Sequence, residues 1–328
     1  MASIFSLLFS RIFPGVNNYS SKAEAIVDEI VEAHSTLVGL PDLRPSETVN
    51  TTLGNLVSLC IRVYDSRTTE TVLNSPRIQN ILPSLRQICS DAESCLEHHW
   101  AVRITIADDE PEAIRRLHQF PYFDNYEELA RLELCALSAT NAGQLPTHIA
   151  FLGAGPLPLT SLSILKKLRQ DNVNDIHSFT SPPPSPKSST ITQAPVVLNV
   201  DRDHQACAAA KALCARLGEG GRGMNFVCED AGSAGEDLME FDSVFLAALV
   251  GTTQEEKEDI IIGVAGKMRP SAHLVIRSAW GLRTCLYPEV DLTTEKMQTV
   301  LDILAIVHPY GKVVNSVIIT RVKEPDEK

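Results

Sequence analysis

The chain has 328 residues, of which 44% are hydrophobic and 21% are charged, a composition typical of a globular protein with a sizeable core. This length suits two ordinary domains, or one α/β domain with a helical extension. The 41 acidic and 29 basic side chains give a formal charge of −12, which argues against a general nucleic-acid binder and against docking on an anionic membrane.

The N-terminus and the cysteines both indicate a cytoplasmic protein. MASIFSLLFSRIF is only superficially like a signal peptide, because Arg11 interrupts its short apolar run and no cleavage site follows. No run of about 18 apolar residues occurs, so no membrane span is predicted. The eight cysteines form no CxxC pair and no zinc-ligand pattern, and most have aliphatic neighbours. We therefore expect buried free thiols.

Helical periodicity dominates the first 142 residues. SSKAEAIVDEIVEAHSTL, TVNTTLGNLVSLCIRVY, IQNILPSLRQICSDAESCLEHHWAVRI and NYEELARLELCALSAT carry apolar residues at helical spacing, with Pro and Asp/Asn-rich joints between them. No alternating strand pattern competes. Residues 1–142 are therefore predicted to form an N-terminal α-helical domain.

After Gly143, short apolar runs alternate with helical stretches. Strands are predicted in THIAFLG, PVVLNVD, MNFVCED, FDSVFLAAL and SAHLVIRSA, and helices in LTSLSILKKLRQ, HQACAAAKALCARL and QEEKEDIIIGVAGKM. This alternation predicts a parallel sheet covered on both faces. TVLDILAIVHP and VVNSVIITRV would add a terminal hairpin, and with it an antiparallel strand. Residues 143–328 are thus predicted to form a Rossmann-like α/β domain, interrupted at about 171–194 by a disordered Pro/Ser-rich insert.

The segment FLGAGPLPL joins the first predicted strand to the next helix. Gly153 and Gly155 would let the backbone approach a ligand closely at the helix N-terminus. Dinucleotide-binding enzymes have a third glycine where this chain has Pro158, which counts against a pyrophosphate site. On these residues alone, a tight turn without a ligand is an equal alternative.

Two acidic residues follow predicted strands at the same edge of the sheet. Asp201 ends the second strand, where an acidic side chain commonly binds both ribose hydroxyls, and Asp230 follows the third strand. A glycine turn with these acids and no phosphate signature suits an adenosine ligand without phosphates, such as S-adenosylmethionine. The alternatives are a helix N-cap for Asp201 and a solvated loop acid for Asp230.

Longer segments resemble nicotianamine synthases. In chain order they are DAESCLEHHW, FPYFDNYEELARLE, HIAFLGAGPLPLTSLSIL, FDSVFLAALVGTTQEEKEDII, LVIRSAWGLRTCLYPEVD and IVHPYGKVVNSVIITR. The resemblance runs from about Val57 to the end. The resemblance implies a class I methyltransferase-type sheet, mostly parallel with an antiparallel terminal strand, and a helical domain that caps the active site. It also implies that three S-adenosylmethionines condense to nicotianamine by 3-amino-3-carboxypropyl transfers, with three methylthioadenosines released and a final azetidine ring closure. S-adenosylmethionine is then a substrate, and no cofactor is expected.

The resemblance also carries over individual residues. The family's acid/base pair falls on Glu97 in LEHHW and Tyr126 in DNYEEL, and Glu133 is a weaker candidate with an ion pair as its alternative. Binding of S-adenosylmethionine is expected from the glycine turn, the strand ends and one arginine: Gly153, Gly155, Pro156, Asp201, Asp230, Ala247 and Arg277. Arg277 would clamp a carboxylate, with an internal salt bridge as its alternative.

This chain departs from the family pattern at one place and offers no metal site. It has RSAWG where the family has RSAHG, so Trp280 replaces a histidine and would stack on the sulfonium or adenine. His98 and His99 are adjacent on a predicted helix and face different ways, so no enzyme-bound metal is expected.

Other functions stay open on the sequence. A methyltransferase would use the strand acids equally well, and transfer to another amine would give a shorter opine-like metallophore. A non-catalytic sensor of adenosyl ligands would bind a partner through the helical domain. The LEHHW and NYEEL segments oppose a plain methyltransferase, and the intact Glu97 and Tyr126 oppose a sensor. No heptad or exposed seam indicates an oligomeric state.

Overall fold

The computed structural model describes residues 16–177, 194–232, 237–251 and 253–324. The chain divides into two compact units. The first comprises residues up to Leu96 with 279–289 and 309–314, and the second comprises 97–278, 290–308 and the residues from Asn315 onward.

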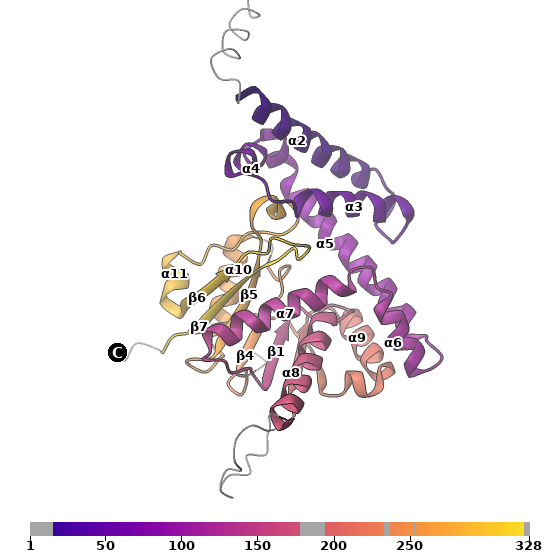
Figure 1. The fold of residues 1–328 in the computed structure, drawn as a ribbon, viewed down its shortest axis with the longest axis vertical. Coiled ribbons are helices and arrows are strands. Elements are labelled where there is room, and N and C mark those ends of the chain that lie inside the picture. Colours follow the sequence, from indigo (N-terminus) through magenta and orange to yellow (C-terminus); the bar gives the residue numbers. More distant parts are fainter. Residues whose placement is uncertain (1–15, 178–193, 233–236, 252, 325–328) are drawn as a thin grey trace, which may run out of the picture. The chain divides into compact units, whose positions relative to one another are not determined.

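Helices build the first unit (Figure 1). They are α2 (Val16–Val38), α3 (Glu47–Cys60), α4 (Ser66–Leu73), the part of α5 (Pro76–Thr105) up to Leu96, and the 3₁₀ helix η2 (Gly281–Cys285). Ser46 and Asp65 begin α3 and α4, because each side chain accepts a hydrogen bond from a backbone N–H of the first turn. Their apolar faces share one core with η2, which includes Ile30, Leu56 and Leu282.

A seven-stranded sheet is the centre of the second unit, in the order β3-β2-β1-β4-β5-β7-β6. Its strands are β1 (His148–Leu152), β2 (Val196–Asp201), β3 (Met224–Cys228), β4 (Ser243–Leu246), β5 (His273–Ser278), β6 (Leu301–Val307) and β7 (Ser316–Val322). β7 runs antiparallel to both β5 and β6, and the other neighbours are parallel.

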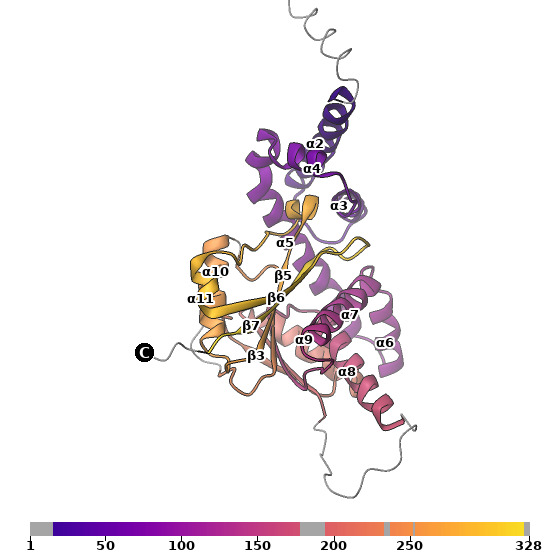
Figure 2. The ribbon, with the colours of Figure 1, turned by 60° about the vertical axis from the view of Figure 1, so that its left-hand side comes forward.

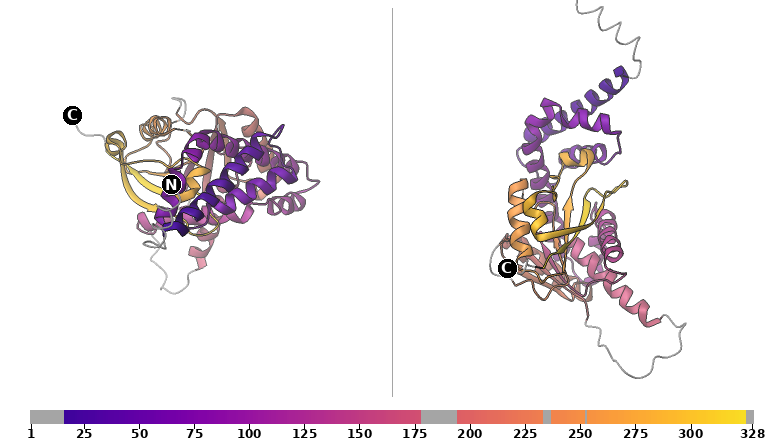
Figure 3. Two further views of the ribbon diagram at one scale, coloured as in Figure 1. Left: turned by 90° about the horizontal axis from the view of Figure 1, so that it is seen from above. Right: turned by 90° about the vertical axis from the view of Figure 1, so that its left-hand side faces the viewer.

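Helices cover both faces of this sheet, which explains the nearly continuous apolar runs of its strands. On one side lie α10 (Gln254–Ala265) and α11 (Glu295–Val300), and on the other lie α7 (Phe123–Thr140), α8 (Leu159–His177) and α9 (His204–Arg216), as Figures 2 and 3 show. Ala150 and Leu152 of β1 belong to the core with Ile261 of α10. The strand order reverses between β1 and β4, where open α/β sheets bind ligands at the carboxyl ends of the strands.

The predicted fold class is confirmed, including the antiparallel strand near the C-terminus. Several elements were not predicted: α4, α6 (Glu110–His118) and α11. Helix α8 continues through residue 177 into the predicted insert, whose residues 178–193 lie outside the described ranges. The compact units divide inside α5, after Leu96, and α7 packs on α8 and β7 within the second unit.

The cysteines are all free, but they are less buried than expected. Only Cys60, Cys214 and Cys285 are buried, and Cys135 is exposed. The expectation of buried thiols is therefore wrong for most of them, because an aliphatic neighbour in sequence does not decide which face of an element is covered. Across the described ranges, the helices include none that is long and apolar enough to cross a bilayer.

Candidate active site

The glycine turn after β1 makes two close approaches that a side chain would block. Gly153 and Gly155 have φ values of +82° and +66°, a region that L-residues with side chains rarely adopt. A Cβ atom on Gly153 would lie 2.4 Å from Cγ2 of Val250 and 3.1 Å from Cβ of Ala247. A Cβ atom on Gly155 would lie 2.7 Å from Oε2 of Glu97. The turn therefore packs on the loop after β4 and receives the carboxylate of Glu97.

Asp201 joins the same turn from the end of β2. Its Oδ2 accepts a hydrogen bond of 2.8 Å from the backbone N–H of Gly155, and its Oδ1 accepts one of 3.0 Å from that of Asp203. Asp203 is the N-cap of α9, since its side chain accepts from the backbone N–H of Gln205. Asp201 thus lies beside the glycine turn, at the edge where the sheet order predicts a ligand.

Glu97 and Tyr126 meet directly. The Tyr126 hydroxyl donates a hydrogen bond of 2.8 Å to Oε1 of Glu97, and both residues are half-buried. The ring of Phe120 packs edge-on against that of Tyr126, with ring centroids 6.0 Å apart. One carboxylate oxygen of Glu97 therefore holds the phenol, and the other faces Gly155.

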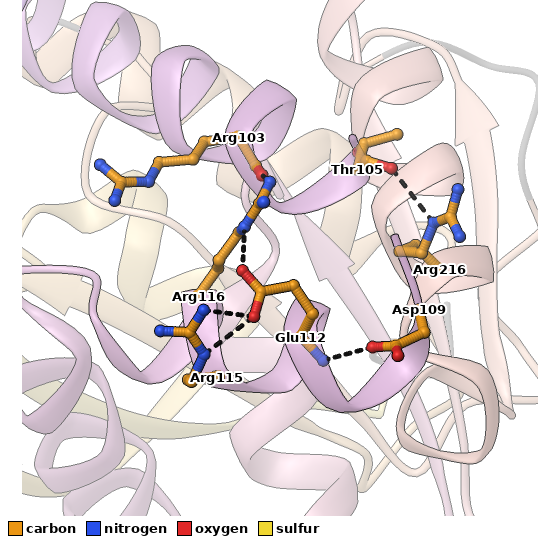
Figure 4. Close-up of polar contacts among 7 residues, drawn as sticks. All are labelled: Arg103, Thr105, Asp109, Glu112, Arg115, Arg116 and Arg216. Atoms are coloured by element: carbon orange, nitrogen blue, oxygen red, sulfur yellow. Dashed lines mark hydrogen bonds and ion pairs between the residues drawn. The ribbon is translucent and has the colours of Figure 1, made fainter. Parts of the chain in front are cut away.

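Arginines hold the end of the helix that carries Glu97 (Figure 4). A guanidinium N–H of Arg116 donates to the carbonyl oxygen of Arg103 at 2.6 Å, and Nε of Arg216 donates to that of Thr105 at 3.1 Å. Glu112 holds Arg116 in place through an ion pair of 2.7 Å. The last carbonyls of a helix have no partner within the helix, so cations stabilise them. The final turn of α5 is thereby fixed to α6 and α9.

Arg277 forms the internal salt bridge that was the alternative to a substrate clamp. Its Nε and one terminal nitrogen donate to the two carboxylate oxygens of Glu133 at 2.7 and 3.2 Å. The same terminal nitrogen donates to Oγ1 of Thr160 at 3.0 Å, and the guanidinium lies 5.1 Å from the ring centroid of Phe151. Glu133 is completely buried and lies seven residues after Tyr126, two turns along one face of α7. The pair therefore anchors α7 to β5 on the face that presents Tyr126.

The remaining predicted binding residues differ in their placement. Ala247 follows β4, and its backbone N–H donates to the carbonyl oxygen of Leu152 at 3.0 Å. Pro156 is buried directly after the turn. Asp230 is exposed, and its Oδ1 accepts from the backbone N–H of Gly232 at 2.9 Å, a local contact that the solvated-loop alternative also expects.

Lys257 was not predicted and shapes the loop after β4. Its side chain is completely buried, and Nζ donates hydrogen bonds of 2.8 Å to the carbonyl oxygens of both Ala248 and Val250. Burial lowers the pKa of this lysine to about 8. Because Val250 contacts Gly153, Lys257 supports the loop against the glycine turn. Its place in the charged segment QEEKED is typical of an exposed helix face, so no sequence pattern predicts its burial.

Trp280 lies in the first unit, where its ring centroid is 5.4 Å from that of Tyr310. His98 is half-buried and His99 is exposed. Within the described ranges, no group of three or more His, Cys, Asp or Glu side chains is arranged to hold a metal ion.

Comparisons with known proteins agree over nearly the whole chain. A family model described as nicotianamine synthase protein matches residues 19–326. Nicotianamine synthase 2 of Arabidopsis thaliana is 34% identical over 296 residues, which cover 90% of this chain and 83% of the relative. Nicotianamine synthase 2 of Oryza sativa subsp. japonica is 34% identical over 307 residues, covering 93% and 85%.

Solved structures show the same fold. The crystal structure of MtNAS in complex with MTA and tNA matches with a TM-score of 0.68 at 18% identity, covering 93% of this chain and 98% of that one. A mutant of MtNAS in complex with S-adenosylmethionine matches with a TM-score of 0.67 at 19% identity, covering 91% and 98%. Together with the family model and the 34% identical relatives, these findings show that the chain belongs to the nicotianamine synthase family.

Proposed function

We propose that this protein is an S-adenosylmethionine aminocarboxypropyltransferase that makes nicotianamine. It condenses three S-adenosylmethionine molecules by successive 3-amino-3-carboxypropyl transfers and releases three methylthioadenosines. Membership of the family supports this activity, since the 34% identical relatives are named nicotianamine synthases. MtNAS, which shares the fold, binds S-adenosylmethionine in one structure and MTA with tNA in another.

The observation that carries the proposal is the position of the Glu97–Tyr126 pair. A plain methyltransferase sheet has no need of a carboxylate delivered from a separate helix to its glycine turn. Here Glu97 binds the Tyr126 hydroxyl through one oxygen and faces Gly155 with the other. The ligand edge of the sheet therefore carries a proton acceptor beside the place where the adenosyl substrate is expected.

The reaction needs a base to deprotonate the attacking ammonium, but it needs no acid to protonate the leaving group. The amine of one substrate attacks the Cγ atom next to the sulfonium of another, a C–N bond forms, and the C–S bond breaks. Its electron pair stays on sulfur, so methylthioadenosine leaves as a neutral thioether without protonation. The attacking nitrogen enters as an ammonium and must lose a proton before each attack. Glu97 accepts that proton, and the Tyr126 hydroxyl orients the carboxylate.

The adenosyl substrate binds at the carboxyl ends of β1, β2 and β4. Asp201 accepts hydrogen bonds from the ribose hydroxyls while its other contact, with the N–H of Gly155, fixes its direction. Gly153 and Ala247 approach each other closely where the glycine turn meets the loop after β4, and they line the substrate site there. Lys257 stabilises that loop by donating a hydrogen bond to the carbonyl oxygen of Ala248.

The direct test is incubation of the purified protein with S-adenosylmethionine alone, followed by mass spectrometry. Nicotianamine with three equivalents of methylthioadenosine is the expected result. Methylthioadenosine with a shorter product would change the number of transfers or the acceptor but keep the chemistry. S-adenosylhomocysteine as the thioether product would contradict the proposal and indicate methyl transfer.

Variants at the pair separate binding from chemistry. Glu97→Gln removes the proton acceptor without changing the size of the side chain, so turnover should fall by about 10²- to 10⁴-fold. S-adenosylmethionine binding, measured by calorimetry, should persist. Asp91→Asn makes the same carboxylate-to-amide change at an exposed position of α5 and should leave turnover intact. An active Glu97→Gln enzyme would exclude Glu97 as the base.

A further inference from the structure

Two thiols lie together at the edge of the sheet next to Asp201. Cys228 ends β3 and is in register with Asp201, which ends β2. The Sγ atom of Cys207, in the first turns of α9, donates to the carbonyl oxygens of Asp201 at 3.4 Å and Val227 at 3.6 Å. These two carbonyls belong to neighbouring strands, so the Cys207 thiol lies over the β2–β3 junction. There it lies beside the Cys228 thiol.

Solvent reaches this pair. Both cysteines are half-buried, and Sγ of Cys228 donates to the carbonyl oxygen of Arg202 at 3.7 Å in an exposed turn. A second pair provides a contrast within the same chain. The thiols of Cys60 and Cys285 also lie beside each other, but both residues are completely buried. A small oxidant in solution meets the first pair directly and the second only after local opening.

We propose that Cys207 and Cys228 are a dithiol site that hydrogen peroxide oxidises to an intramolecular disulfide. The Cys228 thiol loses its proton to solvent, and its thiolate attacks one peroxide oxygen. The O–O bond breaks, a sulfenic acid forms, and the hydroxide that leaves takes up a proton from solvent to give water. The sulfur of Cys207 then attacks the sulfenic sulfur, the S–S bond forms, and a second water leaves. Two sulfur atoms together lose two electrons, and the two peroxide oxygens gain them.

The order of the two thiols follows from their surroundings. Burial, together with the neighbouring Cys228 sulfur as an acceptor for its hydrogen, raises the pKa of the Cys207 thiol to about 12, which keeps it protonated at neutral pH. The bond of Cys228 to Arg202 is exposed, whereas the bonds of Cys207 are partly buried. Cys228 is therefore the thiol that meets the peroxide, and Cys207 is the resolving thiol.

Oxidation changes the surroundings of Asp201. The thiol hydrogen that its carbonyl oxygen accepts is lost, and a covalent bond ties the start of α9 to β3. The carboxylate of Asp201 also accepts a hydrogen bond from the backbone N–H of Gly155. The disulfide therefore weakens S-adenosylmethionine binding, a consequence that rests on the proposed function, whereas the disulfide itself does not.

Peptide mapping tests the disulfide without any activity assay. The full-length reduced protein is treated with hydrogen peroxide, freed of peroxide, blocked with iodoacetamide in denaturant and digested without reductant. The expected product joins the peptides of Cys207 and Cys228 and lacks two hydrogen atoms. The peptides of Cys60 and Cys285 should remain alkylated in the same sample. Oxidation of Cys228 to a sulfinic acid without the cross-link, or equally fast loss of the Cys60 and Cys285 thiols, would overturn the proposal.

Single variants test the order of the steps. In Cys207→Ser, the sulfenic acid on Cys228 has no resolving thiol and should be captured by dimedone. In Cys228→Ser, Cys207 should stay reduced and no dimedone adduct should appear. Capture on Cys207 instead would contradict the assigned order.

Binding of S-adenosylmethionine to the reduced and oxidised wild-type protein tests the consequence. A several-fold weaker affinity after oxidation, restored by dithiothreitol, is expected. An unchanged affinity with the disulfide present would overturn the coupling to Asp201. Failure of the reduced protein to bind S-adenosylmethionine would contradict the proposed function and leave the mapped disulfide unaffected.

Discussion

At the level of single residues, a buried ion pair holds together the helix and the strand beside the site. Arg277 and Glu133 are 144 positions apart in the chain, yet they form a two-point ion pair with almost no exposure. Such a pair compensates the desolvation of each charge only while both partners are present. Its position between β5 and the Tyr126 face of α7 fixes the helix that carries Tyr126.

Removing one partner should therefore be costly. Arg277→Met leaves the Glu133 carboxylate buried without its cation, and we expect the free energy of unfolding to fall by about 3–5 kcal/mol. Urea denaturation measures this change. Arg321→Ala breaks the exposed ion pair with Asp302, so its cost should stay within about 1 kcal/mol. The double variant Arg277→Met with Glu133→Leu should recover part of the loss, and no recovery would argue against the ion pair as the cause.

Lys257 makes stability depend on pH in a predictable direction. Burial lowers its pKa from the ordinary value of 10.5 to about 8 in the folded protein. Between these two values the unfolded chain binds more protons than the folded one, so the contribution of Lys257 to stability rises with pH across that window. Below pH 8 the full cost of burying the charge is present.

Lys257→Met removes this titration but keeps an unbranched chain. The difference in unfolding free energy, wild type minus variant, should increase from pH 8 to pH 10.5 by at most about 3 kcal/mol. Urea unfolding at several pH values measures it, and the titrations that both proteins share cancel. A constant difference across the window would show that the lysine does not change its protonation there.

The position of Glu97 depends on how the C-terminal end of its helix, α5, is held in place. The carbonyl oxygens of Arg103, Thr105 and Asp108 accept hydrogen bonds from arginines of α6 and α9. Without those donors the last turn would exchange its bonds with water and fray. The position of the Glu97 carboxylate thus depends on contacts that are two turns away from it.

Arg216→Ala should loosen that end. We expect a loss of about 1 kcal/mol in stability and faster amide hydrogen exchange in peptides that cover residues 97–108. Turnover should fall through kcat more than through KM, because Glu97, the proposed proton acceptor, would be held less firmly. Arg222→Ala removes an exposed ion pair with Glu219 and should change neither exchange nor turnover. Identical hydrogen exchange in both variants would show that Arg216 does not hold the end of α5 that positions Glu97.

For the molecule as a whole, the site exists only in the folded state. It draws on β1, β2, the loop after β4, α5 and α7, which are distant in sequence. A ligand that binds only there stabilises the fold by mass action, by about 2.7 kcal/mol at one hundred times its Kd.

S-adenosylmethionine should therefore raise the melting temperature of the protein. Variants of two aspartates distinguish an effect on binding from an effect on stability. Asp201→Ala removes the acceptor beside the glycine turn and should abolish the ligand-induced shift. Asp203→Ala removes the N-cap of α9 and should lower stability by about 1 kcal/mol while the shift remains. A full shift in Asp201→Ala would contradict the adenosine-binding role of that residue.

Local hydrophobic patterns suffice to predict the order of strands and helices in the sheet unit from the sequence. Apolar runs such as HIAFL and HLVIRS match fully buried strands, and the terminal hairpin supplied the antiparallel strand. The short helices α4 and α6 escaped prediction, since two turns carry too little periodicity and their start depends on the capping residues Asp65 and Asp109.

Which side chains contact one another is visible only in the folded chain. The sequence offered Arg277 as a substrate clamp and gave no role to Lys257, whereas the structure pairs the first with Glu133 and buries the second under the loop after β4. It also set Glu97 against Gly155 and placed Cys207 beside Cys228. Periodicity reports which face of an element is covered, but the partner across that face is set by packing between distant segments, which local sequence does not encode.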